Sequence, residues 1–251
     1  MNYRLFTLVI LFDLIGRNLK AQNRLEIGIA GGYNKNYLHS STGYRAFTTY
    51  EAESGFEIGL PILYHINDWF AMQIEPAYIQ KNYQIKRTGF FEGIYQKNIN
   101  NYIQLPIIAQ FSFGGKQLRG FLNMGGYAGY WTSGRVKGSA PNVFDNRPEI
   151  ADNEEIDHFL QVYQRYTYNE QYNFDSRRDR RIELGLLAGV GIQYLLQEKY
   201  RFFVEGRYYY GLTDLQKKYM TNQTPRYHDN YGIRIGCLFN LKNIFQNERS
   251  K

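Results

Sequence analysis

Apolar and polar residues alternate along most of this chain with a period of two, which is typical of β-strands that have one apolar face. In the clearest example, Leu184 and Leu186 share a face with Ile192, whereas Glu183 and Gln193 lie on the opposite face. The pattern occurs in eight segments, near residues 25–33, 56–64, 70–78, 103–113, 122–131, 182–194, 202–211 and 231–241. We therefore predict an all-β protein.

The connections between these segments alternate between short and long. Tight turns are predicted at Asn67–Asp68, Gly114–Lys116 and Gln197–Lys199, and long links near 34–54, 82–98, 132–180 and 213–230. Each apolar face runs for ~10 residues, enough for a tilted strand to cross a bilayer. This wiring predicts an eight-stranded antiparallel up-and-down transmembrane β-barrel with short periplasmic turns and long extracellular loops.

The polar faces decide which side points inward. A soluble, lipocalin-like barrel is the competing fold, with its apolar face around a ligand. The polar faces here are rich in glycine and poor in charge, which is too sparse a coat for a surface in water. We predict instead that recurring charged residues pair across a narrow lumen: Glu26, Glu57, Glu75, Glu183, Glu205, Arg207 and Arg234.

Two further features belong to the same strands. Aromatic residues toward the strand ends are predicted to form two interfacial girdles: Tyr33, Tyr64, Trp69, Tyr78, Phe113, Tyr130, Tyr194, Tyr210 and Tyr231. Pro61, Pro76 and Pro106 each remove a ladder hydrogen bond, so we expect bulges or strand ends near the rim at these positions.

Composition agrees with a barrel and excludes other classes. Among 251 residues there are 24 Tyr, 24 Gly and 6 Pro, and the single Cys237 rules out an intrachain disulfide framework. Residues 1–21 are predicted to be a cleaved signal peptide, which leaves residues 22–251 as the barrel with a short C-terminal tail. The formal charge of +7 does not imply nucleic acid in an exported barrel.

Candidate chemistry is sparse. His228 and His158 lie in predicted loops, where an outer-rim hydrolase would need them, but exposed loop histidines explain them better. The acidic stretch 145–157 lacks the glycine and the spacing of a calcium loop. We therefore predict no catalytic residues, no metal and no cofactor.

The link 132–180 is the candidate contact surface. Ile156, Phe159, Leu160 and Tyr163 recur at helical spacing, which predicts a short amphipathic helix against the barrel mouth or a partner. The following arginines offer bidentate contacts to lipopolysaccharide phosphates, and a general anchoring cluster is the equal alternative: Arg177, Arg178, Arg180 and Arg181.

Several short motifs resemble those of the outer-membrane β-barrel family of Gram-negative bacteria that includes PorT-like proteins. They are Ile74-Glu75-Pro76-Ala77-Tyr78, residues 102–107, residues 189–194 with 203–208, and Arg234-x-Gly236-x-x-Phe239-x-Leu241. The resemblance covers about residues 22–241. It implies a non-enzymatic barrel, and some relatives take part in type IX protein secretion. The chain departs from the usual ending by continuing to Lys251.

The sequence thus predicts an integral protein of the bacterial outer membrane, in contact with lipid, lipopolysaccharide and protein partners. A structural or interaction component of an envelope or secretion assembly is the first hypothesis. A narrow pore or ligand-binding barrel is the second, and an outer-rim hydrolase is the third.

Overall fold

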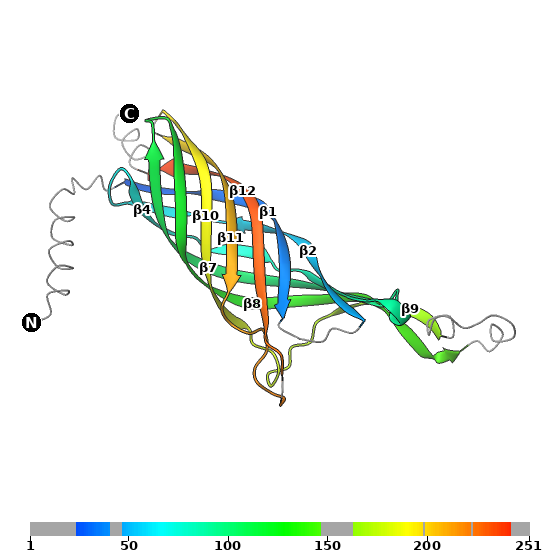
Figure 1. The fold of residues 1–251 in the computed structure, drawn as a ribbon. Coiled ribbons are helices and arrows are strands. Elements are labelled where there is room, and N and C mark those ends of the chain that lie inside the picture. Colours follow the sequence, from blue (N-terminus) through cyan, green and yellow to red (C-terminus); the bar gives the residue numbers. More distant parts are fainter. Residues whose placement is uncertain (1–23, 41–46, 147–162, 198, 222, 242–251) are drawn as a thin grey trace, which may run out of the picture.

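The computed structural model describes residues 24–40, 47–146, 163–197, 199–221 and 223–241. The described strands close into a ring with eight antiparallel positions, drawn in Figure 1. We call each position a stave, whether it holds one strand or consecutive strands in line. In chain order the staves are β1 (Arg24–Ser40), β2 (Thr48–Gly59) continued by β3 (Ile62–His65), β4 (Phe70–Ile74) continued by β5 (Ala77–Gln80) and β6 (Tyr83–Arg87), β7 (Tyr95–Gly114), β8 (Leu118–Asn146), β10 (Ile182–Leu196), β11 (Tyr200–Gly211) and β12 (Arg226–Asn240).

The last strand closes the ring onto the first. β12 pairs with β1 over the whole register from Glu26↔Asn240 to Ser40↔Arg226. A closed sheet has no unpaired edge within the ring, which is the condition for crossing a hydrocarbon layer with strands. The predicted all-β, eight-stranded antiparallel barrel is confirmed.

Two of the three prolines divide staves into shorter strands, and they do so in mid-stave rather than near the rim. Pro61 separates β2 from β3, and Pro76 separates β4 from β5. Pro106 stays inside β7. Its carbonyl accepts a hydrogen bond from Glu75 N, and Glu75 lies in the gap between β4 and β5. The ring nitrogen of Pro106 faces that same gap, so its missing N–H removes no bond from a continuous ladder.

The strands extend well beyond the predicted apolar segments, so the links at the long-loop end are shorter than expected. β1 continues to Ser40, β7 begins at Tyr95 and β12 begins at Arg226. The link expected at 132–180 contains strand at 132–146 and 163–171, since β8 runs to Asn146 and pairs with β9 (Tyr163–Gln171). Polar residues on both faces of these extensions hide the period of two, although the backbone ladder continues.

The predicted helix in this link is not present at Tyr163, the one of its four residues that the structure describes. Tyr163 is the first residue of strand β9, so it does not belong to a helix. Ile156, Phe159 and Leu160 lie outside the described residues. The predicted signal peptide, residues 1–21, and the tail beyond Leu241 also lie outside them.

Apolar side chains cover the outside of the ring. Ile103, Ile182 and Ile235 are each about 60% exposed, and eight of the nine predicted girdle aromatics are exposed on the same surface. Along the barrel axis, β10 rises about 30 Å from Ile182, which pairs with Tyr130, to Tyr194. This rise follows from ~3.3 Å per residue and a strand tilt of ~40°. None of the helices in the described part of the chain is long and apolar enough to cross a membrane.

The inside of the ring is filled. One apolar cluster includes Leu63, Phe121 and Phe203, and a second includes Tyr102, Tyr127 and Tyr209. Both are built from the inward positions of the alternating strands, and buried polar groups lie between and around them. An eight-stranded ring is narrow enough for side chains to fill its interior.

Candidate functional site

The candidate site is the column of charged residues inside the ring, and its centre holds five of them. Arg207 binds Glu205 bidentately, with Nε to Oε1 at 2.9 Å and Nη2 to Oε2 at 2.8 Å. Arg234 Nη1 lies 2.5 Å from Glu75 Oε1 and 3.5 Å from Glu57 Oε1. Arg207 Nη1 also reaches Glu75 Oε2 at 3.3 Å. We call these five residues the central cluster.

Neutral groups add hydrogen bonds to the three carboxylates of the central cluster. Asn123 donates to Glu205 Oε1 at 2.8 Å, Gln73 donates to Glu75 Oε2 at 2.6 Å, and the Tyr209 hydroxyl donates to Glu57 Oε2 at 3.1 Å. The central charges are at most 6% exposed. Buried charges are tolerated when they are paired and hydrogen-bonded in this way.

The other two predicted glutamates lie apart from the centre. Toward the short-turn end, Glu26 binds Arg201 at 2.7 Å and Arg24 at 2.7 Å, with His65 at 3.4 Å, and we call this the lower cluster. Toward the long-loop end, Glu183 accepts from Lys81 at 2.5 Å and from the Tyr127 hydroxyl at 2.6 Å. His228 Nδ1 lies 3.2 Å from the same carboxylate, which completes the upper cluster.

Charge is nearly balanced along the column. Five carboxylates face five arginine and lysine side chains when both histidines are neutral. The central cluster has one more carboxylate than guanidinium groups, whereas the lower cluster has one more guanidinium group than carboxylates. Opposite excesses at neighbouring levels attract each other, which favours this stacking over a random distribution.

Lys81, Arg201 and His228 belong to the column but were not among the predicted residues. All three have the inward parity of residues that were predicted, namely Glu75, Arg207 and Arg234. Lys81 follows the Pro76 interruption, and His228 precedes the apolar part of its strand. Carrying the period of two further along the chain would have identified them.

His228 corrects an expectation. It was expected in an exposed loop, but it lies on β12, is 2% exposed and points into the lumen. The ring of Tyr102 packs edge-on against it at 5.8 Å, and that of Tyr83 lies 6.0 Å away. A substrate would have to displace these rings to reach Nε2. His158 lies outside the described residues.

Two segments fold over the long-loop mouth of the ring, residues 172–181 and residues 212–221 with 223–225. They are joined by backbone hydrogen bonds from Arg180 N to Leu215 O and from Lys217 N to Arg178 O. Trp131 anchors the first segment by stacking on Tyr172 at 5.0 Å. Burial and the neighbouring Asp179 raise the pKa of Tyr172 to about 12, and its hydroxyl donates to Asp179 Oδ1 at 3.0 Å.

The four predicted contact arginines divide into two pairs. Arg178 binds Asp179 at 2.9 Å, and Arg181 donates to the carbonyls of Trp131 and Thr132 while covering the ring of Phe174 at 4.2 Å. Arg177 and Arg180 are exposed. Two of the four arginines are therefore already engaged in intramolecular contacts.

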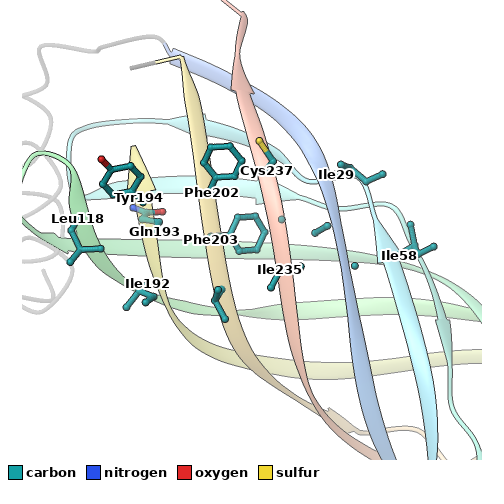
Figure 2. A pocket seen from close by; sticks show the side chains of 14 residues that line it. Ile29, Ile58, Leu118, Ile192, Gln193, Tyr194, Phe202, Phe203, Ile235 and Cys237 are labelled. Carbon is teal, nitrogen blue, oxygen red and sulfur yellow. The ribbon is translucent and has the colours of Figure 1, made fainter. Parts of the chain in front are cut away.

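The outside wall has one marked hollow, of about 670 Å³, and Figure 2 shows the side chains that line it. Ile29, Ile192, Phe202 and Ile235 contribute from neighbouring strands of the ring. These side chains belong to the outward apolar surface, so the hollow suits hydrocarbon chains rather than a polar substrate. In the described part of the chain, no group of three or more His, Cys, Asp and Glu could hold a metal ion.

Glycines give the long lumen side chains their room, and one of them provides a test. A Cβ on Gly189 would overlap Glu205 Oε1, whereas a Cβ on the outward Gly206 would lie 3.9 Å from the Val190 carbonyl oxygen. Gly189→Ala should therefore lower the free energy of unfolding by about 1–3 kcal/mol, by pushing Glu205 away from Arg207. Urea unfolding in lipid vesicles measures the loss.

Gly206→Ala is the matched control, because it makes the same substitution near the same level of the wall. It should leave the unfolding free energy within about 0.5 kcal/mol of the parent. Equal losses in the two variants would mean that strand flexibility, and not the lumen packing, explains the glycine at position 189.

Comparisons with known proteins agree with this architecture. A family model described as outer membrane protein beta-barrel domain matches residues 20–217. No curated protein sequence matches the chain.

Similar solved structures include Neisserial surface protein A, with 12% identity, 85% of this chain and 96% of that chain covered, and a TM-score of 0.40. OprG from Pseudomonas aeruginosa has 14% identity, 89% and 99% coverage, and a TM-score of 0.46. Ail of Yersinia pestis has 16% identity, 85% and 98% coverage, and a TM-score of 0.38. At such low identities, the functions of these proteins have no bearing on this chain.

Proposed function

The chain belongs to the outer membrane protein beta-barrel domain family, and from this premise we propose that it is a non-enzymatic barrel that serves as a structural or interaction component of an envelope assembly. As a member of this family it is an integral β-barrel of the bacterial outer membrane, with lipid against its apolar wall. Barrels of this kind keep their short turns in the periplasm. The long-loop end is therefore extracellular.

The filled lumen is the observation that carries the non-conducting role. Three ionic clusters and two apolar clusters occupy successive levels, and the two mouth segments lie above them. Arg234, Glu75 and Glu205 are each at most 2% exposed, so the centre of the column has little contact with solvent. This filling favours a closed barrel over the narrow-pore alternative.

An extracellular sheet supports the interaction role. The upper parts of β2, β6, β7 and β8 continue past the ring, and β9 adds a fifth strand at the edge of this sheet. Figure 1 shows β8 running out beyond β10 and β11 to meet β9. Among the described strands β9 pairs only with β8, so its other edge offers free backbone groups to an extended segment of a partner.

We further propose that the envelope assembly in which this barrel takes part is a protein-secretion assembly. This proposal is supported by the resemblance of the strand motifs to those of PorT-like proteins, and the exposed β9 edge is compatible with docking in such an assembly. Lipopolysaccharide contact is proposed for the exposed Arg177 and Arg180, since guanidinium groups bind phosphates bidentately.

One contact among the described residues bears on the hydrolase alternative. The pairing of His228 with Glu183 resembles a base with its orienting carboxylate. Its burial, together with the direct pairing of Glu183 with Lys81, points instead to a structural ion cluster.

Two measurements test the proposed function. The mature barrel in a planar bilayer should give no stable channels, because the lumen is filled. A photo-activatable residue at position 167, exposed on β9, should yield one cross-linked species of defined mass in intact cells, whereas the same residue at the periplasmic position 116 should not.

Thr167→Pro provides a further control, because proline on an edge strand disturbs extended pairing while leaving the ring intact. It should lower the yield of cross-links made from position 169. Stable conductance from the parent protein, or equal cross-linking from positions 167 and 116, would contradict the proposal.

A further inference from the structure

The periplasmic end of the lumen opens into a polar vestibule of about 640 Å³. Arg24, Lys116 and Arg119 line it together with Asp68 and Gln197. Arg24 and Arg119 have the inward parity of their strands, and Asp68, Lys116 and Gln197 lie on the turns, so the vestibule lies at the turn end of the ring and faces the periplasm rather than lipid. Its volume is in the range of small-molecule sites.

Positive charge exceeds negative charge around this vestibule. Arg201, which is 3% exposed, and Arg24 both bind Glu26, so two guanidinium groups share one carboxylate. Arg24 and Arg119 also lie close enough to Arg201 for their charges to act on it unfavourably. The Asp68 carboxylate and the Lys116 ammonium form no ion pair with any described residue.

Two of these arginines also have unused donors. Arg119 Nη2 donates to the Asp68 carbonyl oxygen at 2.6 Å, but its Nε is buried without a hydrogen-bond partner among the described residues. Arg201 Nη1 is in the same condition, although Arg201 lies deeper than the residues that line the vestibule. Buried guanidinium donors without acceptors are costly, because desolvation is not compensated.

A negatively charged ligand would balance the excess positive charge that lines the vestibule. We propose that the vestibule binds a soluble periplasmic oxyanion that carries phosphate or carboxylate groups. Arginine forks bind such groups bidentately, and Lys116 on the turn adds a mobile charge at the entrance. The volume exceeds that of a single phosphate, which favours an anion with two or more charged groups. The site is independent of the extracellular partner, so either proposal can fail alone.

The test uses the mature barrel in an uncharged detergent, with inorganic phosphate and pyrophosphate as probes in isothermal titration calorimetry at low salt. Pyrophosphate should bind more tightly than phosphate, and added KCl should weaken both. Arg119→Gln should weaken pyrophosphate binding about tenfold or more, since a charge-assisted pair is removed. Arg119→Lys keeps the charge without the fork, so it should give an intermediate loss.

Lys199→Gln is the matched control, because Lys199 is exposed at the same end of the barrel but does not line the vestibule. It should bind pyrophosphate like the parent. The inference is overturned if the parent shows no pyrophosphate binding up to about 10 mM, or if Arg119→Gln and Lys199→Gln bind pyrophosphate equally. It is also overturned if the parent binds pyrophosphate only in lipid discs that contain an anionic phospholipid. If Arg119→Gln does not fold, the comparison of Arg119→Lys with Lys199→Gln decides in the same way.

Discussion

Replacing Arg234 with glutamine is expected to lower the free energy of unfolding by about 3–5 kcal/mol, the usual result of removing one partner from a buried ion cluster. Arg234 contacts all three carboxylates of the central cluster, with Nη1 near Glu75 and Glu57 and Nε 3.6 Å from Glu205. Without it, Arg207 alone would face three buried carboxylates. Urea unfolding in lipid vesicles measures the change.

A second substitution distinguishes electrostatics from packing. Adding Glu57→Gln to Arg234→Gln removes one of the unbalanced carboxylates, so the double variant should recover part of the lost stability. The Tyr209 hydroxyl can still donate to the amide oxygen at position 57. An additive loss in the double variant would mean that Arg234 acts mainly by filling space.

Lys86→Gln is the surface control for this prediction. Lys86 lies 3.6 Å from Glu51, and both side chains are 45% exposed. Exposed ion pairs contribute about 0–1 kcal/mol, so this substitution should change the unfolding free energy by less than about 1 kcal/mol. A loss as large as that of Arg234→Gln would contradict the assignment of stability to the lumen.

Replacing Ile235 with arginine is expected to lower the free energy of unfolding from lipid vesicles by about 2–4 kcal/mol, the cost of a guanidinium group near the middle of the apolar band. Ile235 is 63% exposed on β12, midway between Tyr231 and Phe239 along the strand. The cost arises because the charged group loses hydration in hydrocarbon. Reversible unfolding from vesicles of defined thickness is the measurement.

Thr167→Arg is the control on the extracellular sheet, because position 167 is exposed on β9 and faces water. It should leave the folding free energy within about 0.5 kcal/mol of the parent. If Ile235→Arg were equally harmless, the wall around position 235 would not lie in hydrocarbon.

Much of the barrel could be predicted from local pattern, because the two faces of a strand alternate with a period that is visible in the residues themselves. Glu57, Glu75, Glu205, Arg207 and Arg234 could be assigned to the lumen in this way, since each occupies a polar position between apolar neighbours. The turn at Asn67–Asp68 was similarly evident, because short polar turns separate apolar strands.

The limits of the strands could not be predicted in the same way. Above the lipid band polar residues occupy both faces of β7, β8 and β9, even where one face is buried, as at Asn98 and Asn100, so apolar and polar residues do not alternate there and the link at 132–180 resembled a loop. There the backbone ladder sustains the strands, and its register depends on distant residues. For the same reason a helix was predicted where Tyr163 in fact begins a strand.

Several ion pairs inside the lumen were decided only by the tertiary structure, although Arg207 pairs with Glu205, and Arg24 with Glu26, two residues apart on one strand. Local alternation indicates that Glu26 and Glu183 point inward, but it does not show that Glu26 also binds Arg201, 175 residues away, or that Glu183 binds Lys81, 102 residues away. Inward or outward direction is a property of each strand, whereas the level at which two side chains meet depends on the stagger of all eight staves around the closed ring.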